Sequence, residues 1–278
     1  MKKLFPTILI FILFLSGCTS SKEVFTDEIF LEPTEAVNVI INSAQDYSAY
    51  PNVMYGWGLK KNVNAPPEVP ENIKSLLKKY NAFYIDSAPK TLYLTFDEGY
   101  ENGYTAQILD VLKKNNVPAA FFITGPYLEK ETELVKRMVL EGHTVGNHSI
   151  NHPSLPSVTD DEKLKKEITD LNDKFKEKFG KEMKYMRPPR GEYSERTLAI
   201  SRDLGYTNVF WSFAYRDWET NNQKGTDYAY DEIMKGVHDG AVLLLHAVSK
   251  DNANVLDTAI KDLKKKGYTF KSLDEFGA

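Results

Sequence analysis

Two adjacent acids and a pair of histidines are the residues of this chain whose types and spacing suit chemistry. Asp97 and Glu98 follow an apolar run that predicts a buried strand, and burying a carboxylate costs several kcal/mol unless a cation or hydrogen bonds compensate it. His148 and His152 lie further along, in a segment that Pro153 restricts to a tight loop or a single helical turn. Imidazole and carboxylate groups favour Zn²⁺ or a similar transition metal, and an incomplete ligand shell leaves room for water. These four side chains predict a metal-assisted hydrolase.

A third histidine, His246, ends another apolar run and has two interpretations. It is either a core histidine that caps a buried strand, or a proton-transfer group whose tautomer Asp217 fixes and whose pKa Asp217 raises. The segment Arg-Pro-Pro-Arg-Gly at 187–191 is equally open. It is either a stiff turn with solvated arginines, or a functional turn in which Arg187 pairs with Asp97 and keeps its carboxylate ionised. In the second case the prolines fix the backbone, so the next amide N–H can be aimed at an oxyanion.

Strand and helix patterns alternate from Thr91 to the end of the chain and must position these groups. Apolar runs predict strands at 92–96, 119–123, 144–146, 185–186, 207–211, 241–245 and 268–270. Helical apolar spacing predicts helices at 105–115, 131–141, 160–179, 195–204, 228–237 and 255–266, with a short helix at 71–80 and an edge strand at 84–85 upstream. This alternation predicts an α/β fold: a distorted (β/α) barrel of about seven parallel strands with an N-terminal extension, and the candidate groups at its mouth.

The composition is that of an ordinary globular protein, with 278 residues of which 42% are hydrophobic and 27% charged. The net charge is −4 and lysines are mixed with acids, so nothing indicates a nucleic-acid partner. An aromatic content of 12%, including 16 tyrosines, is typical of proteins that bind sugars or fill a barrel core.

The first eighteen residues predict a targeting segment that takes no part in the fold. Their apolar stretch at 4–15 is too short to span a bilayer comfortably. Leu-Ser-Gly-Cys at 15–18 resembles a bacterial lipobox, which predicts lipidation of Cys18 and an extracytoplasmic protein anchored to the membrane; the alternative is an ordinary signal peptide. Cys18 is the only cysteine, so no internal disulfide can form. The predicted organisation is a signal peptide at 1–18, a tether at 19–51, an extension packing on the barrel at 52–90 and the main domain at 91–278.

Five segments, in this order, resemble the motifs of the polysaccharide deacetylases, which carry the NodB homology domain of carbohydrate esterase family 4. They are Thr-Phe-Asp-Glu-Gly at 95–99, His-Ser-Ile-Asn-His at 148–152, Arg-Pro-Pro-Arg-Gly at 187–191, Asp-Trp at 217–218 and Leu-Leu-His at 244–246. The resemblance implies a NodB-type barrel and a divalent metal, Zn²⁺ foremost, with Co²⁺, Ni²⁺ and Mn²⁺ also suited to such ligands. The chain departs from the family at Glu98, where the family has a metal-binding aspartate.

The resemblance implies a role for each candidate residue. The residues are catalytic Asp97, Arg187, Asp217 and His246; metal-binding Glu98, His148 and His152; and substrate-binding Pro189, Arg190 and Trp218. Asp97 is then the general base that Arg187 orients, and His246 is the general acid that Asp217 tunes. The backbone amide of Arg190 helps to hold the oxyanion, and its guanidinium is suited to grip the lactyl carboxylate of muramic acid.

The resemblance is strongest to the sporulation branch of the family, and it extends to Tyr-Gly-Trp-Gly at 55–58. That branch implies removal of acetyl groups from N-acetylmuramic acid in peptidoglycan glycan strands, after a wall amidase has removed the stem peptide. The freed amine then closes on the lactyl carboxyl to form the muramic δ-lactam of spore cortex. Two alternatives remain: an N-acetylglucosamine deacetylase that gives lysozyme resistance, and an inactive wall-binding lipoprotein whose altered first motif no longer holds metal.

Overall fold

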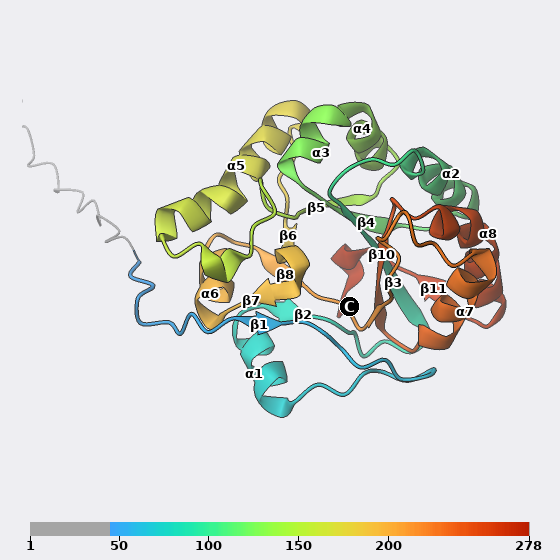
Figure 1. Cartoon of the computed structure of the whole chain (residues 1–278), viewed down its shortest axis with the longest axis horizontal. Helices are drawn as coiled ribbons and strands as arrows, with labels where there is room; N and C mark the ends of the chain where they lie inside the picture. The colour runs from blue at the N-terminus through green and yellow to red at the C-terminus, as the bar shows by residue number, and fades with distance from the viewer. Residues whose placement is uncertain (1–44, 278) are drawn as a thin grey trace, which may run out of the picture. The chain divides into compact units, whose positions relative to one another are not determined.

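A curled sheet of nine strands forms the centre of the fold, with helices along its outer side (Figure 1). The computed structural model describes residues 45–277. The strands of the sheet are β2 (Ala82–Phe83), β3 (Thr91–Glu98), β4 (Ala119–Ile123), β5 (Thr144–Asn147), β6 (Tyr185–Met186), β8 (Thr207–Val209), β9 (Phe213–Ala214), β10 (Ala241–His246) and β11 (Thr269–Phe270). Their spatial order is β2-β8-β6-β5-β4-β3-β10-β9, with β11 beside the start of β3, and these strands pair in parallel.

Helices connect these strands and cover the outer face of the sheet, as α/β crossovers require. The helices are α1 (Glu71–Lys79), α2 (Thr105–Asn115), α3 (Gly125–Lys130), α4 (Thr132–Leu140), α5 (Asp161–Phe179), α6 (Glu195–Asp203), α7 (Thr226–Gly236) and α8 (Lys250–Lys265). Short 3₁₀ turns lie at Leu155–Ser157, Pro189–Gly191 and Leu273–Glu275. A separate antiparallel pair joins β1 (Tyr55–Gly56) to β7 (Glu192–Tyr193).

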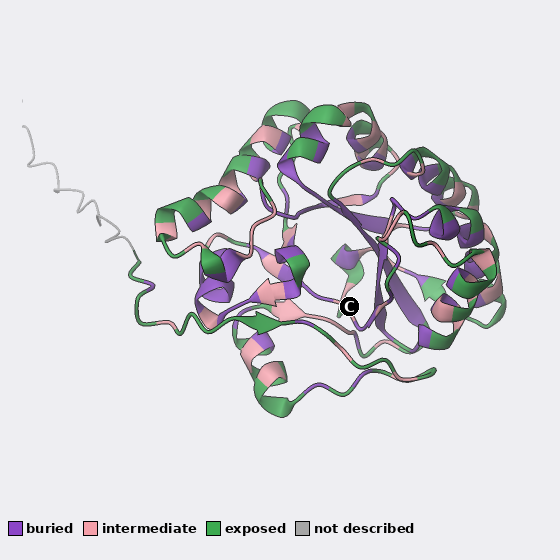
Figure 2. Ribbon diagram, viewed as in Figure 1, coloured by how far each residue is buried: buried purple, intermediate pink, exposed green. Residues whose placement is uncertain are grey.

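Strand β3 carries the two adjacent acids and is buried along its whole length. Because successive side chains of a strand point to opposite faces, its residues divide between two cores. Phe96 belongs to the large core between sheet and helices, where it stacks on Phe121 with ring centroids 5.1 Å apart. Tyr93 belongs to a smaller core inside the curl of the sheet, together with Val242 of β10. Figure 2 shows the long central strands β3, β4 and β10 as mostly buried ribbons, surrounded by helices that carry exposed residues.

The predicted alternation of strands and helices is confirmed, and α2, β4 and β6 have the predicted bounds. The sheet has nine strands rather than about seven, partly because β9 was not predicted. The strand predicted at 207–211 ends at Val209, and the chain then crosses to form β9 beside β10. The edge strand predicted at 84–85 lies at 82–83 instead, and Ile85 makes a single antiparallel bridge to Ala241.

Capping groups explain two further differences from the predicted helices. The helix predicted at 255–266 begins at Lys250, because Ser249 caps its first turn by accepting a hydrogen bond from the amide of Asn252 at 3.2 Å. The helix predicted at 131–141 is preceded by α3, where Thr124 caps the chain in the same way and accepts from the amide of Tyr127 at 3.4 Å.

The described part of the segment before residue 91 packs against the barrel. Tyr47 is buried and its hydroxyl donates to Asp203 at 3.1 Å, so the end of the range predicted as a tether, 19–51, is part of the fold. Trp57 is also buried: its backbone N–H donates to the carbonyl of Gly191 at 2.8 Å, and its indole N–H to the carbonyl of Trp211 at 2.8 Å. This upstream segment therefore supports the turn that carries Arg190.

The predicted signal peptide at 1–18, with the candidate lipidation site Cys18, and the tether up to residue 44 lie outside the described residues. Between residues 45 and 277, no helix combines the length and apolar character that crossing a bilayer requires.

Candidate active site

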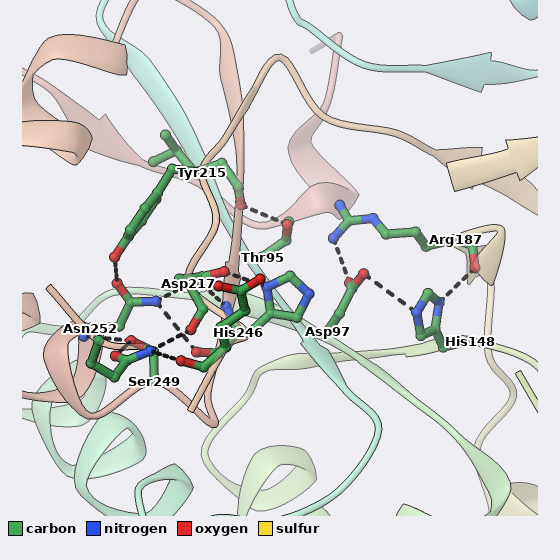
Figure 3. A network of polar contacts seen from close by, with 12 residues as sticks. Thr95, Asp97, His148, Arg187, Tyr215, Asp217, His246, Ser249 and Asn252 are labelled. Atoms are coloured by element: carbon green, nitrogen blue, oxygen red, sulfur yellow. Dashed lines mark hydrogen bonds and ion pairs between the residues drawn. The ribbon is translucent and has the colours of Figure 1, made fainter. Parts of the chain in front are cut away.

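The candidate groups meet at the carboxyl ends of the parallel strands, as predicted. Asp97 near the end of β3 is in register with His246 at the end of β10, so both side chains project from the same face of the sheet. His148 follows β5 and Arg187 follows β6, on the other side of β3. Figure 3 shows the result: Asp97 lies between His246 on one side and Arg187 with His148 on the other.

Asp97 is held by a buried arginine. Nη1 of Arg187 donates to Oδ1 of Asp97 at 2.8 Å, while Nε of Arg187 donates to the carbonyl of Val209 at 2.9 Å. The guanidinium lies over the ring of Phe122, 4.2 Å from its centroid. Burial opposes ionisation of Asp97, but the charge of Arg187 and the hydrogen bond that it donates outweigh burial and lower the pKa of the carboxyl. Asp97 is therefore an oriented carboxylate that can accept a proton.

His148 and His152 direct their ring nitrogens at each other. Nδ1 of His148 lies 2.8 Å from the carbonyl of Arg187, which only accepts, so Nδ1 carries the proton and Nε2 keeps its lone pair. The two Nε2 atoms are 3.2 Å apart, close to the roughly 3.4 Å that separates two nitrogen ligands of a tetrahedral zinc ion. Burial lowers the pKa of both imidazoles, that of His152 to about 4, so both are neutral, as metal ligands must be.

These two histidines form a partial metal site. Within residues 45–277, no group of three or more His, Cys, Asp or Glu side chains is arranged to hold a metal ion. The nearest carboxylate oxygen, Oδ2 of Asp97, is 3.4 Å from Nε2 of His148. The pair fits an ion that takes two ligands from His148 and His152 and leaves its other positions to water or substrate.

A strained loop rather than a helical turn brings the histidines together. The side-chain oxygen of Asn147 accepts from the amide of Ser149 at 2.8 Å, and Oγ of Ser149 accepts from the amide of His152 at 2.8 Å. Ser149 has φ 65° and His152 has φ 58°, left-handed conformations that cost roughly 1–2 kcal/mol for a residue with a side chain. Arg190, across the cavity, has φ 58° as well. Three of the left-handed non-glycine residues thus lie around this site; the others of the described chain are Asn64, Asn81, Lys90 and Asn116.

His246 and Asp217 form the second ion pair. Nδ1 of His246 lies 2.7 Å from Oδ1 of Asp217, and the backbone N–H of His246 donates to Oδ2 at 2.8 Å. Burial lowers the pKa of His246, but the attraction of Asp217 outweighs it and the pKa is raised. The interpretation of His246 as a mere strand cap therefore does not fit, because its ring is paired with a buried acid and borders a cavity. A protonated His246 can donate from Nε2 into that cavity.

Two adjoining cavities of about 420 and 960 Å³ share the same polar centre. Both are lined by Asp97, His148, His152, Trp218 and His246. Trp218 is 47% exposed, and its ring lies 5.4 Å from that of His246. Arg190 lines the larger cavity together with two further cations, Lys61 and Arg216. The cleft thus combines an exposed aromatic platform with a wall that carries three cations and Glu192.

Two predicted site residues lie elsewhere. Glu98 is fully buried and lines neither cavity, because β3 continues through it and places its side chain on the face opposite Asp97. There it lies near Tyr127 and Glu101, and neither of its oxygens has a hydrogen-bond partner among the described residues. This placement contradicts its prediction as a metal ligand. Pro189 is also buried and lines neither cavity; it begins the 3₁₀ turn that carries Arg190.

We expect Glu98→Gln to stabilise the protein at neutral pH. Burial raises the pKa of Glu98 well above its ordinary 4.5, with Glu101 adding to the shift. Because the pKa of Glu98 is higher in the folded than in the unfolded state, this group does not lower the free energy of unfolding below about pH 4.5, but it lowers it increasingly as the pH rises. The uncharged amide of glutamine does not titrate, so Glu98→Gln avoids this loss of stability. Denaturant unfolding at pH 7.5 should show a gain of about 1–2 kcal/mol that disappears at pH 4.5.

Glu101→Gln is the control. The Glu101 carboxylate accepts hydrogen bonds from the amide of Gly103 and the hydroxyls of Thr105 and Tyr127, so this substitution should destabilise the protein. A loss of stability in Glu98→Gln at pH 7.5 would contradict this account.

Sequence reasoning missed several residues that shape the cleft. Tyr100 is 55% exposed and lines the smaller cavity, while Trp57 and Trp211 line the larger one. A large apolar side chain in a polar loop next to an acidic motif was the available signal for Tyr100. Trp57 was marked only by the resemblance of Tyr-Gly-Trp-Gly at 55–58 to the sporulation branch, and its place in the cleft was not predictable, because only the fold brings residue 57 beside residue 211.

Comparisons with known proteins agree with this geometry. The family model described as polysaccharide deacetylase matches residues 85–209. The chain is 49% identical to the peptidoglycan-N-acetylmuramic acid deacetylase PdaA of Bacillus subtilis over 243 residues, which are 86% of this chain and 92% of that protein. It is 33% identical to a peptidoglycan-N-acetylglucosamine deacetylase of Bacillus cereus over 70% of this chain and 92% of that one.

Comparison with solved structures also finds family 4 carbohydrate esterases. The structure of Bacillus subtilis PdaA, a family 4 carbohydrate esterase, superposes with a TM-score of 0.79 and 49% identity, covering 81% of this chain and 97% of that chain. A family 4 carbohydrate esterase from Bacillus anthracis superposes with a TM-score of 0.70 and 46% identity, covering 82% and 98%.

Proposed function

The chain belongs to the polysaccharide deacetylases of carbohydrate esterase family 4, and from this premise we propose that it de-N-acetylates N-acetylmuramic acid in peptidoglycan. As a member it is a hydrolase of amide bonds, and its family is metal-dependent in general. The observation that carries the chemistry is the placement of an ionised Asp97 beside the His148–His152 pair and opposite the His246–Asp217 pair. The greater identity to the muramic acid deacetylase than to the glucosamine deacetylase supports the choice of sugar.

The chain's own residues divide the proton transfers of amide hydrolysis between them. His148 and His152 would hold a divalent ion, Zn²⁺ foremost, whose chemistry is Lewis-acid activation of water and of the acetyl carbonyl. Asp97, kept ionised by Arg187, accepts the proton of the attacking water. The backbone amide of Arg190 helps to stabilise the oxyanion. His246, kept protonated by Asp217, donates to the leaving amine, so acetate and a free amino sugar are released.

We propose that Arg190 recognises the carboxylate that distinguishes muramic acid from glucosamine. Without its stem peptide, the lactyl group of N-acetylmuramic acid ends in a free carboxylate, which arginine binds well. Lys61 pairs with Glu232 and Arg216 with Glu219, whereas Arg190 has no ion-pair partner among the described residues. Arg190 is thus the cation of the cleft wall that is available to an anionic sugar.

Arg190→Ala should lower kcat/KM about 10–100-fold on peptide-free N-acetylmuramic acid glycan, because a hydrogen bond to a charged group contributes roughly 1.5–3 kcal/mol. On N-acetylglucosamine oligomers the change should be within about threefold, because those sugars lack the carboxylate. Arg216→Ala is the matched control and should leave both values near wild type. An equal loss on both sugars would remove the carboxylate contact from the proposal.

The proposed function is tested by the products. Full-chain protein is incubated with peptide-free and with peptide-bearing glycan, with and without chelator, and the sugars are identified by mass spectrometry. We expect acetyl loss from muramic acid of peptide-free glycan only, abolished by the chelator and followed by loss of water as the lactam closes. Deacetylated glucosamine would favour the alternative deacetylase, and unchanged glycan would favour a wall-binding protein.

The pH dependence should be bell-shaped. Asp97 must be ionised, which its lowered pKa allows, and His152 must be neutral to bind metal, so the His152 pKa of about 4 places the acid limb. His246 must be protonated, and its raised pKa places the alkaline limb above about 6.5. Asp217→Asn removes the attraction that raises this pKa, so the alkaline limb of kcat should move to lower pH by about one unit. An unchanged alkaline limb would mean that another group donates the proton.

We propose further that the protein works outside the membrane on a lipid anchor at Cys18, after a wall amidase, and that its product is the δ-lactam of spore cortex. The lipobox-like Leu-Ser-Gly-Cys at 15–18 supports the anchor. Cys18→Ala should release the protein from the membrane fraction, and a deletion strain should form spores whose cortex lacks the lactam. Retention of the variant on membranes would contradict the anchor.

A further inference from the structure

A chain of buried polar groups continues behind the His246–Asp217 pair (Figure 3). Nδ2 of Asn252 donates to Oδ2 of Asp217 at 2.6 Å, and Asn252 is only 1% exposed. The side-chain oxygen of Asn252 in turn accepts a hydrogen bond from the hydroxyl of Tyr215. Tyr215 and Asn252 take no part in the proposed proton transfers, yet they connect directly to the acid that orients His246.

The chemistry of the three groups fixes how the Asn252 amide is oriented. An ionised carboxylate only accepts hydrogen bonds, so the amide must present its nitrogen to Asp217 and its oxygen to Tyr215. The Tyr215 hydroxyl must then donate. Burial, together with the charge of Asp217, raises the pKa of Tyr215, so the hydroxyl keeps its proton. Tyr215 thereby selects the amide orientation in which Oδ1 of Asn252 faces the Tyr215 hydroxyl. In that orientation Nδ2 of Asn252 faces Asp217 and donates to it.

The backbone of Asn252 is fixed from the opposite direction. Ser249, the N-cap of α8, accepts from the amide of Asn252 at 3.2 Å, and the Ser249 hydroxyl donates to Oε1 of Gln223 at 2.7 Å. A residue in the first turn of a capped helix has little freedom to move. Asn252 therefore reaches Asp217 from a rigid position.

We propose that Asn252 is a positioning residue for the proton donor: it holds the Asp217 carboxylate so that Oδ1 faces Nδ1 of His246, and Tyr215 fixes the amide that does so. This rests on the proposed role of His246 as general acid. Without Asn252, Oδ2 of Asp217 keeps a single donor, the backbone N–H of His246. The carboxylate can then rotate, and water entering beside it weakens its hold on the imidazolium.

The other charges around His246 do not replace this contact. Asp97 raises the pKa of His246 and Arg187 lowers it, but Asp217 is the acid that bonds its ring. A looser Asp217 thus reduces the fraction of His246 that is protonated and misaligns the proton that it donates. Substrate binding should change little in Asn252 variants, because Asn252 lines neither cavity of the cleft. Tyr215 lines the larger cavity, but its hydroxyl bonds Asn252, so Tyr215→Phe keeps the ring in the cavity wall and removes only that contact.

The test combines Asn252→Ala, Tyr215→Phe and the double variant, with Asn254→Ala, an exposed position on the same helix, as the control. Asn252→Ala should lower kcat about 10–30-fold with KM within twofold, and move the alkaline limb of kcat to lower pH. Tyr215→Phe should lower kcat about three- to fivefold. Because Tyr215 acts through Asn252, the double variant should match Asn252→Ala alone. Asn254→Ala should behave as wild type.

Three results would overturn the proposal. They are additive losses in the double variant, a rise in KM at unchanged kcat, and an unchanged alkaline limb in Asn252→Ala. If Asn252→Ala does not fold, Tyr215→Phe, which removes one oxygen, decides by the same kcat and pH criteria.

Nitrogen-15 NMR titration of His246 in the full chain is independent of the deacetylase assay. A fall in the His246 pKa in the variants supports the positioning role even if the proposed substrate is wrong, and no fall refutes it even if the substrate is right.

Discussion

Asp97→Asn should lower kcat about 10²–10⁴-fold, the range that a positioned general base contributes. The amide has nearly the same shape and can still accept a hydrogen bond from Arg187 through its oxygen, so the variant should fold and bind glycan. It cannot take a proton from water, because an amide nitrogen has no basic lone pair at neutral pH. Steady-state kinetics on peptide-free glycan measure the loss, with KM expected within about threefold of wild type.

The loss in Asp97→Asn must be separated from loss of the metal. Oδ2 of Asp97 lies 3.4 Å from His148, so the metal content of the variant should be measured by elemental analysis beside its kinetics. We expect wild-type stoichiometry with impaired turnover. Undiminished kcat would remove Asp97 from its role as base, and a metal-free variant would assign it to the ligand set instead.

His152→Ala should abolish stoichiometric metal binding and lower kcat about 10³-fold or more, because Lewis-acid activation contributes several kcal/mol to the barrier. The partner ligand His148 stays fixed by its bond to the Arg187 carbonyl, so the variant keeps half of the site. Elemental analysis and kinetics with added Zn²⁺ provide the measurement. A single remaining imidazole should bind the ion too weakly to be saturated at micromolar metal.

Glu98→Gln is the matched control for this experiment. The family resemblance implies that Glu98 is a metal ligand, whereas its position on the face of β3 opposite Asp97 implies that it is not. We expect it to bind metal and turn over as the wild type does. Loss of metal in Glu98→Gln would return Glu98 to the ligand set. Full activity in His152→Ala would contradict the two-histidine site.

The elements with strong patterns were predictable from sequence. The helix α2 and the strand β4 have the predicted bounds because their apolar spacing is regular over many residues. The two-residue strands β1, β7 and β9 carry no pattern of their own, since their pairing is decided by distant partners. The candidate catalytic groups Asp97 and His246 were predicted to meet because both follow apolar runs that end at the same edge of the sheet.

Glu98 and Asn252 show where sequence reasoning reaches its limit. The first strand was predicted to end at residue 96, but it continues through Glu98, and that extension decides which face the side chain takes. Asn252 lay outside the helix predicted from residue 255, because the cap at Ser249 was not recognised. In both cases an error of a few residues at an element boundary changed the role of a polar side chain.

The contact of Trp57 with Gly191 and Trp211 links the upstream segment to the cleft. One wall of the larger cavity comes from chain upstream of residue 85, where the match to the family model begins, while Asp97 and His246 lie downstream. Substitutions in this upstream segment can therefore change the shape of the cavity wall without altering Asp97 or His246.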